Sequence, residues 1–128
     1  MAKCIQINLR RCRAAQDLLY QTASERNVQV LLISEQNRNP EKASWFRDRR
    51  GDAAISVLQT CTEQINGTEQ GNGYVCVVSG NTAYYSCYYS PNKDLEDYEL
   101  DLRELESSIR QRRGDILLGG DFNSKSRS

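Results

Sequence analysis

One short segment constrains the fold of this chain more than any other. Residues 28–33 read Val-Gln-Val-Leu-Leu-Ile, a nearly continuous apolar run that is rich in branched side chains. Such a run is typical of a strand that is buried on both faces, as in proteins built from layers of helix and sheet. The segment therefore predicts a layered α/β fold.

Strand-like and helix-like patterns alternate along the chain. Residues 4–9 alternate in polarity, with Ile5, Ile7 and Leu9 on one face, which is typical of a strand. Residues 95–109 instead carry apolar side chains three and four positions apart, which is typical of an amphipathic helix. We expect strands at about residues 3–9, 28–34, 53–59, 74–79, 82–89 and 115–119, and helices at about 13–27 and 94–113.

Glycines predict two of the turns. Gly80-Asn81 separates two strand-like runs and indicates a tight hairpin. Gly114 is expected to end the second helix, because glycine adopts the left-handed conformation without strain. Residues 60–73 are expected to form a turn-rich connection with no strand of their own.

Composition limits the class of protein. The 128 residues are enough for one domain, residues 1–128, with a hydrophobic core of its own. Seventeen basic and seventeen acidic residues balance, which argues against purely charge-driven binding to nucleic acid. Neither a membrane span nor a secretory leader is expected, so we expect a nuclear or cytoplasmic protein with no membrane partner. Five cysteines with no histidine and no close pair are expected to be reduced rather than zinc ligands.

Polar residues follow three of the expected strands. Asn8 ends the first, Glu35 follows the buried run, and Asp121 and Asn123 follow the last. Ligands collect at the carboxyl ends of strands in α/β sheets, and Mg²⁺ prefers oxygen ligands, so these residues predict a site for a metal ion and a phosphate. Taken singly each has a simpler interpretation, because an acidic residue after a strand is more often a helix cap or a solvated loop residue.

Four motifs, in order along the chain, resemble those of the exonuclease III and apurinic endonuclease-like family, also called endonuclease/exonuclease/phosphatase proteins. Within that family they are most similar to the endonuclease domain of non-LTR, LINE-type retrotransposons. The motifs are Gln6-Ile7-Asn8, Leu32-Ile33-Ser34-Glu35-Gln36, Tyr89-Ser90-Pro91-Asn92 and Gly119-Gly120-Asp121-Phe122-Asn123-Ser124-Lys125-Ser126.

The resemblance implies a fold and a role for each site residue. The fold would be a DNase I-like layered sandwich of two mixed β-sheets flanked by helices. Glu35 and Asn8 would hold Mg²⁺ or Mn²⁺, and Tyr89 would contact the scissile phosphate. Asp121 would position or deprotonate the attacking water, and Asn123 would stabilise the developing charge. Tyr89 has an alternative interpretation as an ordinary sheet residue among six other tyrosines.

The resemblance also implies a reaction and partners. The enzyme would nick a double-stranded DNA target and leave a 3′-hydroxyl that primes reverse transcription. A downstream reverse transcriptase would bring in the element's own RNA.

The family's later segments, including one with an essential histidine, have no counterpart in these residues. We therefore expect a partial domain, incomplete at the C-terminus and inactive alone, that leaves Leu31, Ile33 and Leu117 without cover. Two alternatives are a non-catalytic remnant that at most binds DNA or a partner, and a phosphatase or phospholipase of the same superfamily.

Overall fold

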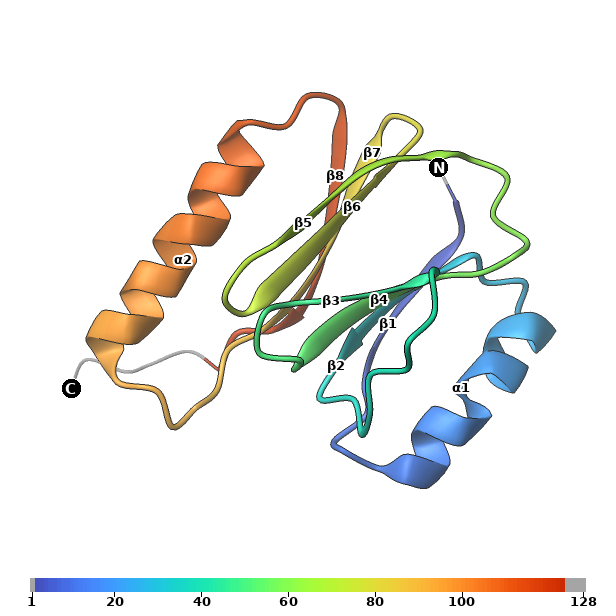
Figure 1. Cartoon of the computed structure of the whole chain (residues 1–128), viewed down its shortest axis with the longest axis horizontal. Helices are drawn as coiled ribbons and strands as arrows, with labels where there is room; N and C mark the ends of the chain where they lie inside the picture. Colours follow the sequence, from blue (N-terminus) through green and yellow to red (C-terminus); the bar gives the residue numbers. More distant parts are fainter. Residues whose placement is uncertain (1, 124–128) are drawn as a thin grey trace.

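Two β-sheets lie face to face with one helix on each outer side (Figure 1). The computed structural model describes residues 2–123, so the Ser124-Lys125-Ser126 end of the last motif lies outside it. Each sheet has four strands, in the orders β1-β2-β4-β3 and β5-β6-β7-β8. The layered α/β sandwich expected from the sequence is confirmed.

Each half of the chain builds one sheet and one helix. The first half comprises β1 (Cys4–Asn8), α1 (Arg13–Glu25), β2 (Val30–Ser34), β3 (Trp45–Arg47) and β4 (Ala53–Val57). The second half comprises β5 (Ile65–Gln70), β6 (Tyr74–Ser79), β7 (Thr82–Tyr88), α2 (Leu95–Arg110) and β8 (Asp115–Asp121). Among the described residues, no helix is long and apolar enough to cross a membrane.

Both sheets are mixed, and each has one parallel pair. β1 runs parallel to β2 with Asn8 aligned to Ser34, and β7 runs parallel to β8 with Tyr88 aligned to Asp121. The other neighbouring strands are antiparallel. Each parallel pair therefore brings two carboxyl ends, and the residues that follow them, to the same edge of its sheet.

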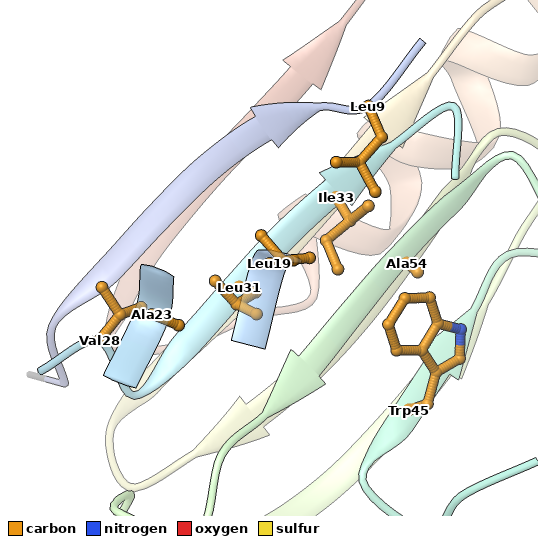
Figure 2. Packing of buried hydrophobic residues seen from close by; sticks show 8 residues of the cluster. All are labelled: Leu9, Leu19, Ala23, Val28, Leu31, Ile33, Trp45 and Ala54. Carbon is orange, nitrogen blue, oxygen red and sulfur yellow. The ribbon is translucent and has the colours of Figure 1, made fainter. Parts of the chain in front are cut away.

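Apolar side chains fill three layers. Leu31 and Ile33 of β2 pack against α1, where Leu19 lies over them (Figure 2). Val30 and Leu32 of the same strand point the other way, into the layer between the sheets. A third layer separates the second sheet from α2. The prediction of a strand buried on both faces is confirmed, and the expectation that Leu31 and Ile33 lack cover is wrong because α1 covers them.

Strand β7 is also buried on both faces, and its residues alternate between two neighbours. Tyr85 and Cys87 belong to the layer beneath α2, whereas Tyr84 belongs to the layer between the sheets. The Ser86 hydroxyl donates to the carbonyl of Ile33 in the first sheet at 2.6 Å. Even-numbered residues of β7 therefore face the first sheet, and odd-numbered residues face α2.

Two strands were not expected. β5 occupies part of the stretch predicted to be a turn-rich connection, and three-residue β3 lies in the polar segment before β4. The helix α2 ends at Arg110, so Gly114 does not end it. Gly114 instead adopts a φ of +87° in the turn into β8, where a Cβ would lie 2.5 Å from Asn81 Oδ1. The predicted hairpin is confirmed, since Gly80-Asn81 joins the Ser79–Thr82 pair.

Candidate active site

The carboxyl ends of strands from both sheets meet at one place. The Tyr88 hydroxyl, at the end of β7, donates to Glu35 Oε1, just after β2, at 3.2 Å. Tyr88 is also the register partner of Asp121 at the end of β8. Asn8 ends β1 beside Ser34, the residue before Glu35. The structure thus gathers Asn8, Glu35, Tyr88 and Asp121 from four strands.

Glu35 is held in a backbone conformation that few residues other than glycine adopt. Its φ is +50°, in the left-handed region. Its N–H donates to the Asp52 carbonyl at 2.8 Å, and its carbonyl accepts the Arg11 N–H at 2.7 Å. These two hydrogen bonds fix the Glu35 backbone from both sides, so the direction of its carboxylate is set by the surrounding loops.

Backbone strain is concentrated at this end of the molecule. Five non-glycine residues in the described chain have a positive φ, and four of them are Arg10, Arg11, Glu35 and Asn123. Asn8 Oδ1 accepts the Arg10 N–H at 2.8 Å and so stabilises the first of these turns. Strained residues persist where the surrounding structure enforces them, and they gather at binding and catalytic sites.

Two glycines bring Asp121 into place. A Cβ on Gly119 would lie 2.8 Å from Gln6 Cγ, so only glycine lets β8 approach the first sheet this closely. Gly120 has a φ of +145°, and a Cβ there would lie 2.1 Å from the Cys87 carbonyl oxygen. The two consecutive glycines of the last motif are therefore required by packing, and the carboxylate that follows them is delivered to the edge of the site.

Asn123 stabilises the loop that carries Asp121. Its backbone N–H donates to Asp121 Oδ1 at 3.0 Å. Its side-chain amide donates to the Tyr89 carbonyl at 2.8 Å, while the Tyr89 N–H donates to the Asp121 carbonyl at 2.9 Å. The Asn123 side-chain amide thus holds the chain just after β7, and the Asn123 backbone N–H orients the Asp121 carboxylate.

The structure does not bring the Tyr89 hydroxyl to this site. Tyr89 is fully buried on the α2 side, stacked on Phe122 and edge-on to Tyr98 with ring centroids 5.4 and 5.8 Å away. Burial raises the pKa of this phenol far above its usual range. The alternation of β7 explains the difference, because Tyr88 shares a face with Ser86 and Tyr89 does not. Tyr88 was missed from the sequence, because the alternation of the strand shows that the two tyrosines face opposite ways but not which of them faces the first sheet.

Charge around Tyr88 keeps its phenol neutral. Burial raises the pKa of Tyr88, and the carboxylates of Glu35 and Asp121 raise it further, while the Arg11 guanidinium opposes them. Arg11 itself is anchored, with Nη2 2.5 Å from Asp52 Oδ1 and Nη1 3.1 Å from the Gln36 carbonyl oxygen. At neutral pH the site therefore offers a phenol donor and a positioned cation beside two carboxylates.

A buried carboxylate behind the site, also missed from the sequence, organises the loop before β4. Asp48 is fully buried and accepts four backbone N–H groups. Its Oδ1 accepts from Asp52 and Ala53 at 2.8 and 3.0 Å, and its Oδ2 accepts from Arg50 and Gly73 at 3.3 and 3.0 Å. Through Asp52, this loop holds both the Glu35 backbone and the Arg11 side chain.

The oxygen donors fit a magnesium ion that keeps most of its water. Within residues 2–123, no group of three or more His, Cys, Asp or Glu side chains is placed to hold a metal. The Glu35 carboxylate and the Asn8 amide oxygen are both hard donors. Mg²⁺ is often bound by one or two carboxylates, with waters and substrate phosphates completing its shell. The donor set therefore suits an ion shared with a phosphate, and not one enclosed by protein.

Comparison with solved structures identifies the fold. The endonuclease domain of TRAS1, a telomere-specific non-LTR retrotransposon, superposes with a TM-score of 0.72 at 24% identity, over 98% of this chain and 61% of that one. An AP endonuclease from Archaeoglobus fulgidus superposes with a TM-score of 0.67 at 15% identity, over 96% of this chain and 58% of that one. This chain has their fold.

The resemblance is therefore confirmed at the level of fold. No family model and no curated protein matches the sequence. The chain spans about three fifths of the length of the two endonucleases, with 61% and 58% of their chains matched.

Proposed function

We propose that this chain carries the metal-dependent active site of a DNA endonuclease of the non-LTR retrotransposon type. The observation that supports this most is the meeting of Glu35, Tyr88 and Asp121 at the carboxyl ends of strands from both sheets. A fold shared with an endonuclease domain of that type supports it further. The substrate would be double-stranded DNA in the nucleus, and the element's RNA would arrive through a reverse transcriptase.

Glu35 and Asn8 would hold the ion, Mg²⁺ or Mn²⁺. When bound, the ion would act as a Lewis acid on the phosphate. Tyr88 would keep the Glu35 carboxylate in place through its hydrogen bond, and its neutral phenol would lie beside the phosphate oxygens. Arg11, anchored on Asp52, would add positive charge near the same group. Fixed donors and charges of this kind stabilise the charge that develops during phosphate transfer.

Asp121 would orient the attacking water and accept its proton. The water oxygen forms a bond to phosphorus, and the bond from phosphorus to the 3′-oxygen breaks. Asn123 would keep Asp121 aligned through its N–H at 3.0 Å. The leaving oxygen would take its proton from solvent, because the 128 residues contain no histidine. Without a side-chain acid, the rate is expected to be roughly 10²- to 10⁴-fold lower than in an enzyme that has one.

Nicking of supercoiled plasmid by this chain at high concentration tests the proposal. The sequence predicts a partial domain that is inactive alone, but Glu35, Tyr88 and Asp121 still meet, so we expect slow conversion to open circles. The conversion should require Mg²⁺ and be lost in Glu35→Gln and Asp121→Asn. Tyr88→Phe should be slower than the parent, whereas Tyr89→Phe should not. Glu106→Gln, an exposed carboxylate of α2, is the matched control.

Three results would contradict the proposal. Cleavage without added metal, or equal cleavage by all variants, would place the activity elsewhere. Complete absence of Mg²⁺-dependent nicking would favour a non-catalytic remnant that only binds DNA. Hydrolysis of a phosphate monoester instead of DNA would favour a phosphatase.

A further inference from the structure

A polar pocket opens beside Tyr88. Its volume is about 220 Å³. The residues that line it are Arg50, Asp52, Tyr88, Ser90, Asn92 and Lys93. Because Tyr88 forms a wall of this pocket and also contacts Glu35, a group bound here would lie next to the candidate active site.

The two cations of the pocket share one buried carboxylate. Asp101 of α2 is only 6% exposed. Its Oδ2 lies 2.9 Å from Arg50 Nη1 and 2.8 Å from Lys93 Nζ. The Lys93 side chain is 16% exposed and the Arg50 side chain 37% exposed. One carboxylate and two cations leave a net charge of +1 in a partly buried position, where an anion would complete the charge balance.

The surrounding charges favour an anion on one side only. Beyond Arg50 and Lys93, away from Tyr88, a larger pocket of about 530 Å³ is lined by Asp97 and Glu104 as well as Asp101. Those carboxylates would repel an anion. On the Tyr88 side the lining carboxylate is Asp52, and it is already paired with Arg11 at 2.5 Å.

We propose that the pocket beside Tyr88 is a subsite for a backbone phosphate of the DNA strand, adjacent to the phosphate bound at Glu35. The proposal rests on the proposed function. The Arg50 guanidinium offers a planar set of donors, and Lys93 offers a compact charge, which together suit phosphate oxygens. Asp101 is a positioning residue, because it holds both cations on the wall of the pocket before DNA arrives. The subsite recognises phosphate and not bases, so it adds affinity without sequence preference.

Salt dependence of DNA binding tests the subsite. Binding of the 128-residue chain to a labelled duplex would be measured by fluorescence anisotropy over a range of salt concentrations. Loss of one phosphate contact should lower the slope of log K against log salt by roughly 0.9. We expect that loss for Lys93→Gln and for Arg50→Gln, equally on duplexes of different sequence. Arg110→Gln, an exposed cation paired with Glu106 elsewhere on α2, should leave the slope unchanged.

A second probe separates this proposal from the proposed function. Inorganic phosphate should shift the amide resonances of Asn92 and Lys93 in the parent chain and not in Lys93→Gln. If DNA binds but the slope of both variants equals that of the parent, the subsite is wrong and the endonuclease proposal survives. If no DNA binds and phosphate still shifts these resonances, the pocket binds phosphate, but its assignment to DNA is wrong and the endonuclease proposal fails with it. If neither DNA nor phosphate produces an effect, both proposals fail.

Discussion

Glu35 has a backbone that glycine would adopt at lower free energy. A left-handed conformation costs a residue with a Cβ roughly 1–2 kcal/mol. Here the strain is enforced on both sides of the residue, because the Glu35 N–H donates to the Asp52 carbonyl and the Glu35 carbonyl accepts the Arg11 N–H. A strained residue with a side chain at such a position points to a functional role for that side chain, because stability alone would favour glycine.

Because of this strain, we expect the usual stability order of alanine and glycine variants to be reversed at Glu35. Glu35→Gly should unfold at a higher urea concentration than Glu35→Ala, by roughly 1–2 kcal/mol in the free energy of unfolding, because only glycine relieves the positive φ. Glu106, in the middle of α2, is the control position. There the alanine variant should be the more stable one by about 1 kcal/mol. If the alanine variant is more stable than the glycine variant at both positions, the Glu35 backbone is not strained.

Asp48 supports the site from behind and should be one of the least replaceable residues. Asp48→Asn replaces one acceptor oxygen with a donor that faces two backbone N–H groups. The free energy of unfolding should fall by about 3 kcal/mol, since a buried donor left without a partner costs roughly 1–3 kcal/mol. Chemical denaturation would measure the loss. Asp17→Asn, on the surface of α1, should change it by less than about 1 kcal/mol, and an equal loss there would refute the argument.

At the scale of elements, β8 is an edge strand that exposes apolar side chains. In residues 2–123 it pairs with β7 and with no other strand, and its Ile116 and Leu118 are each 38% exposed. An open edge that carries apolar side chains is prone to pair with other chains. The uncovered side chains of this strand are thus Ile116 and Leu118. Leu117 packs against the layer between the sheets, so the expectation that it lacks cover is wrong, as it is for Leu31 and Ile33.

The open edge predicts self-association. Sedimentation at increasing protein concentration should show reversible association, and Leu118→Lys should reduce it without lowering the thermal midpoint by more than a few degrees. Leu100→Lys, on an exposed face of α2, should have no effect on association even though Leu100 is 58% exposed. Equal association of the parent and Leu118→Lys would mean that β8 is not the contact.

Helices and strands with clear apolar patterns could be predicted from the sequence, whereas polar strands could not. Both helices and β1, β2, β4, β6, β7 and β8 have clear periodicity, and the structure contains them all. Strand β5 reads Ile-Asn-Gly-Thr-Glu-Gln, and its residues are alternately half-buried and exposed. Backbone pairing with β6 stabilises β5, and the local sequence pattern carries no information about this partner strand.

The site residues that stand at strand ends could be predicted from the sequence. The site residue whose place depends on which face of a strand it occupies could not. Asn8, Glu35 and Asp121 each follow a recognisable strand, so their meeting could be anticipated. Tyr88 and Tyr89 are adjacent aromatic residues in a strand buried on both sides, so composition cannot assign their faces. The face is decided by β7 packing between the first sheet and α2, which is a property of the assembled layers.

At the scale of the whole molecule, buried phenols and thiols predict loss of stability in alkali. Burial raises the pKa of five of the seven tyrosines, Tyr74, Tyr84, Tyr85, Tyr88 and Tyr89. It also raises the pKa of the Cys87 thiol to about 12. Below the ordinary values, roughly 8.5 for cysteine and 10 for tyrosine, folded and unfolded chains hold the same protons. Above them the unfolded chain loses protons that the folded chain keeps, so stability falls.

The urea midpoint should therefore be nearly constant up to about pH 8 and fall steadily from there to about pH 11. The near-ultraviolet absorbance of tyrosinate should appear together with unfolding, since the buried phenols ionise only when the layers open. Two of the seven tyrosines lie outside this set, so absorbance from more than two tyrosinates before any loss of structure would show that these phenols are not buried in solution.

The proposed site places Asn8, Glu35, Tyr88 and Asp121 around one metal ion, held by Glu35 and Asn8, at the carboxyl ends of four strands. Paramagnetic broadening by Mn²⁺, followed in the amide spectrum of the labelled chain, measures its position directly. We predict that substoichiometric Mn²⁺ broadens the resonances around these four residues first, that Mg²⁺ reverses the effect, and that Glu35→Gln abolishes it. Broadening centred on the acidic face of α2, or unchanged by Glu35→Gln, would show that the ion binds elsewhere.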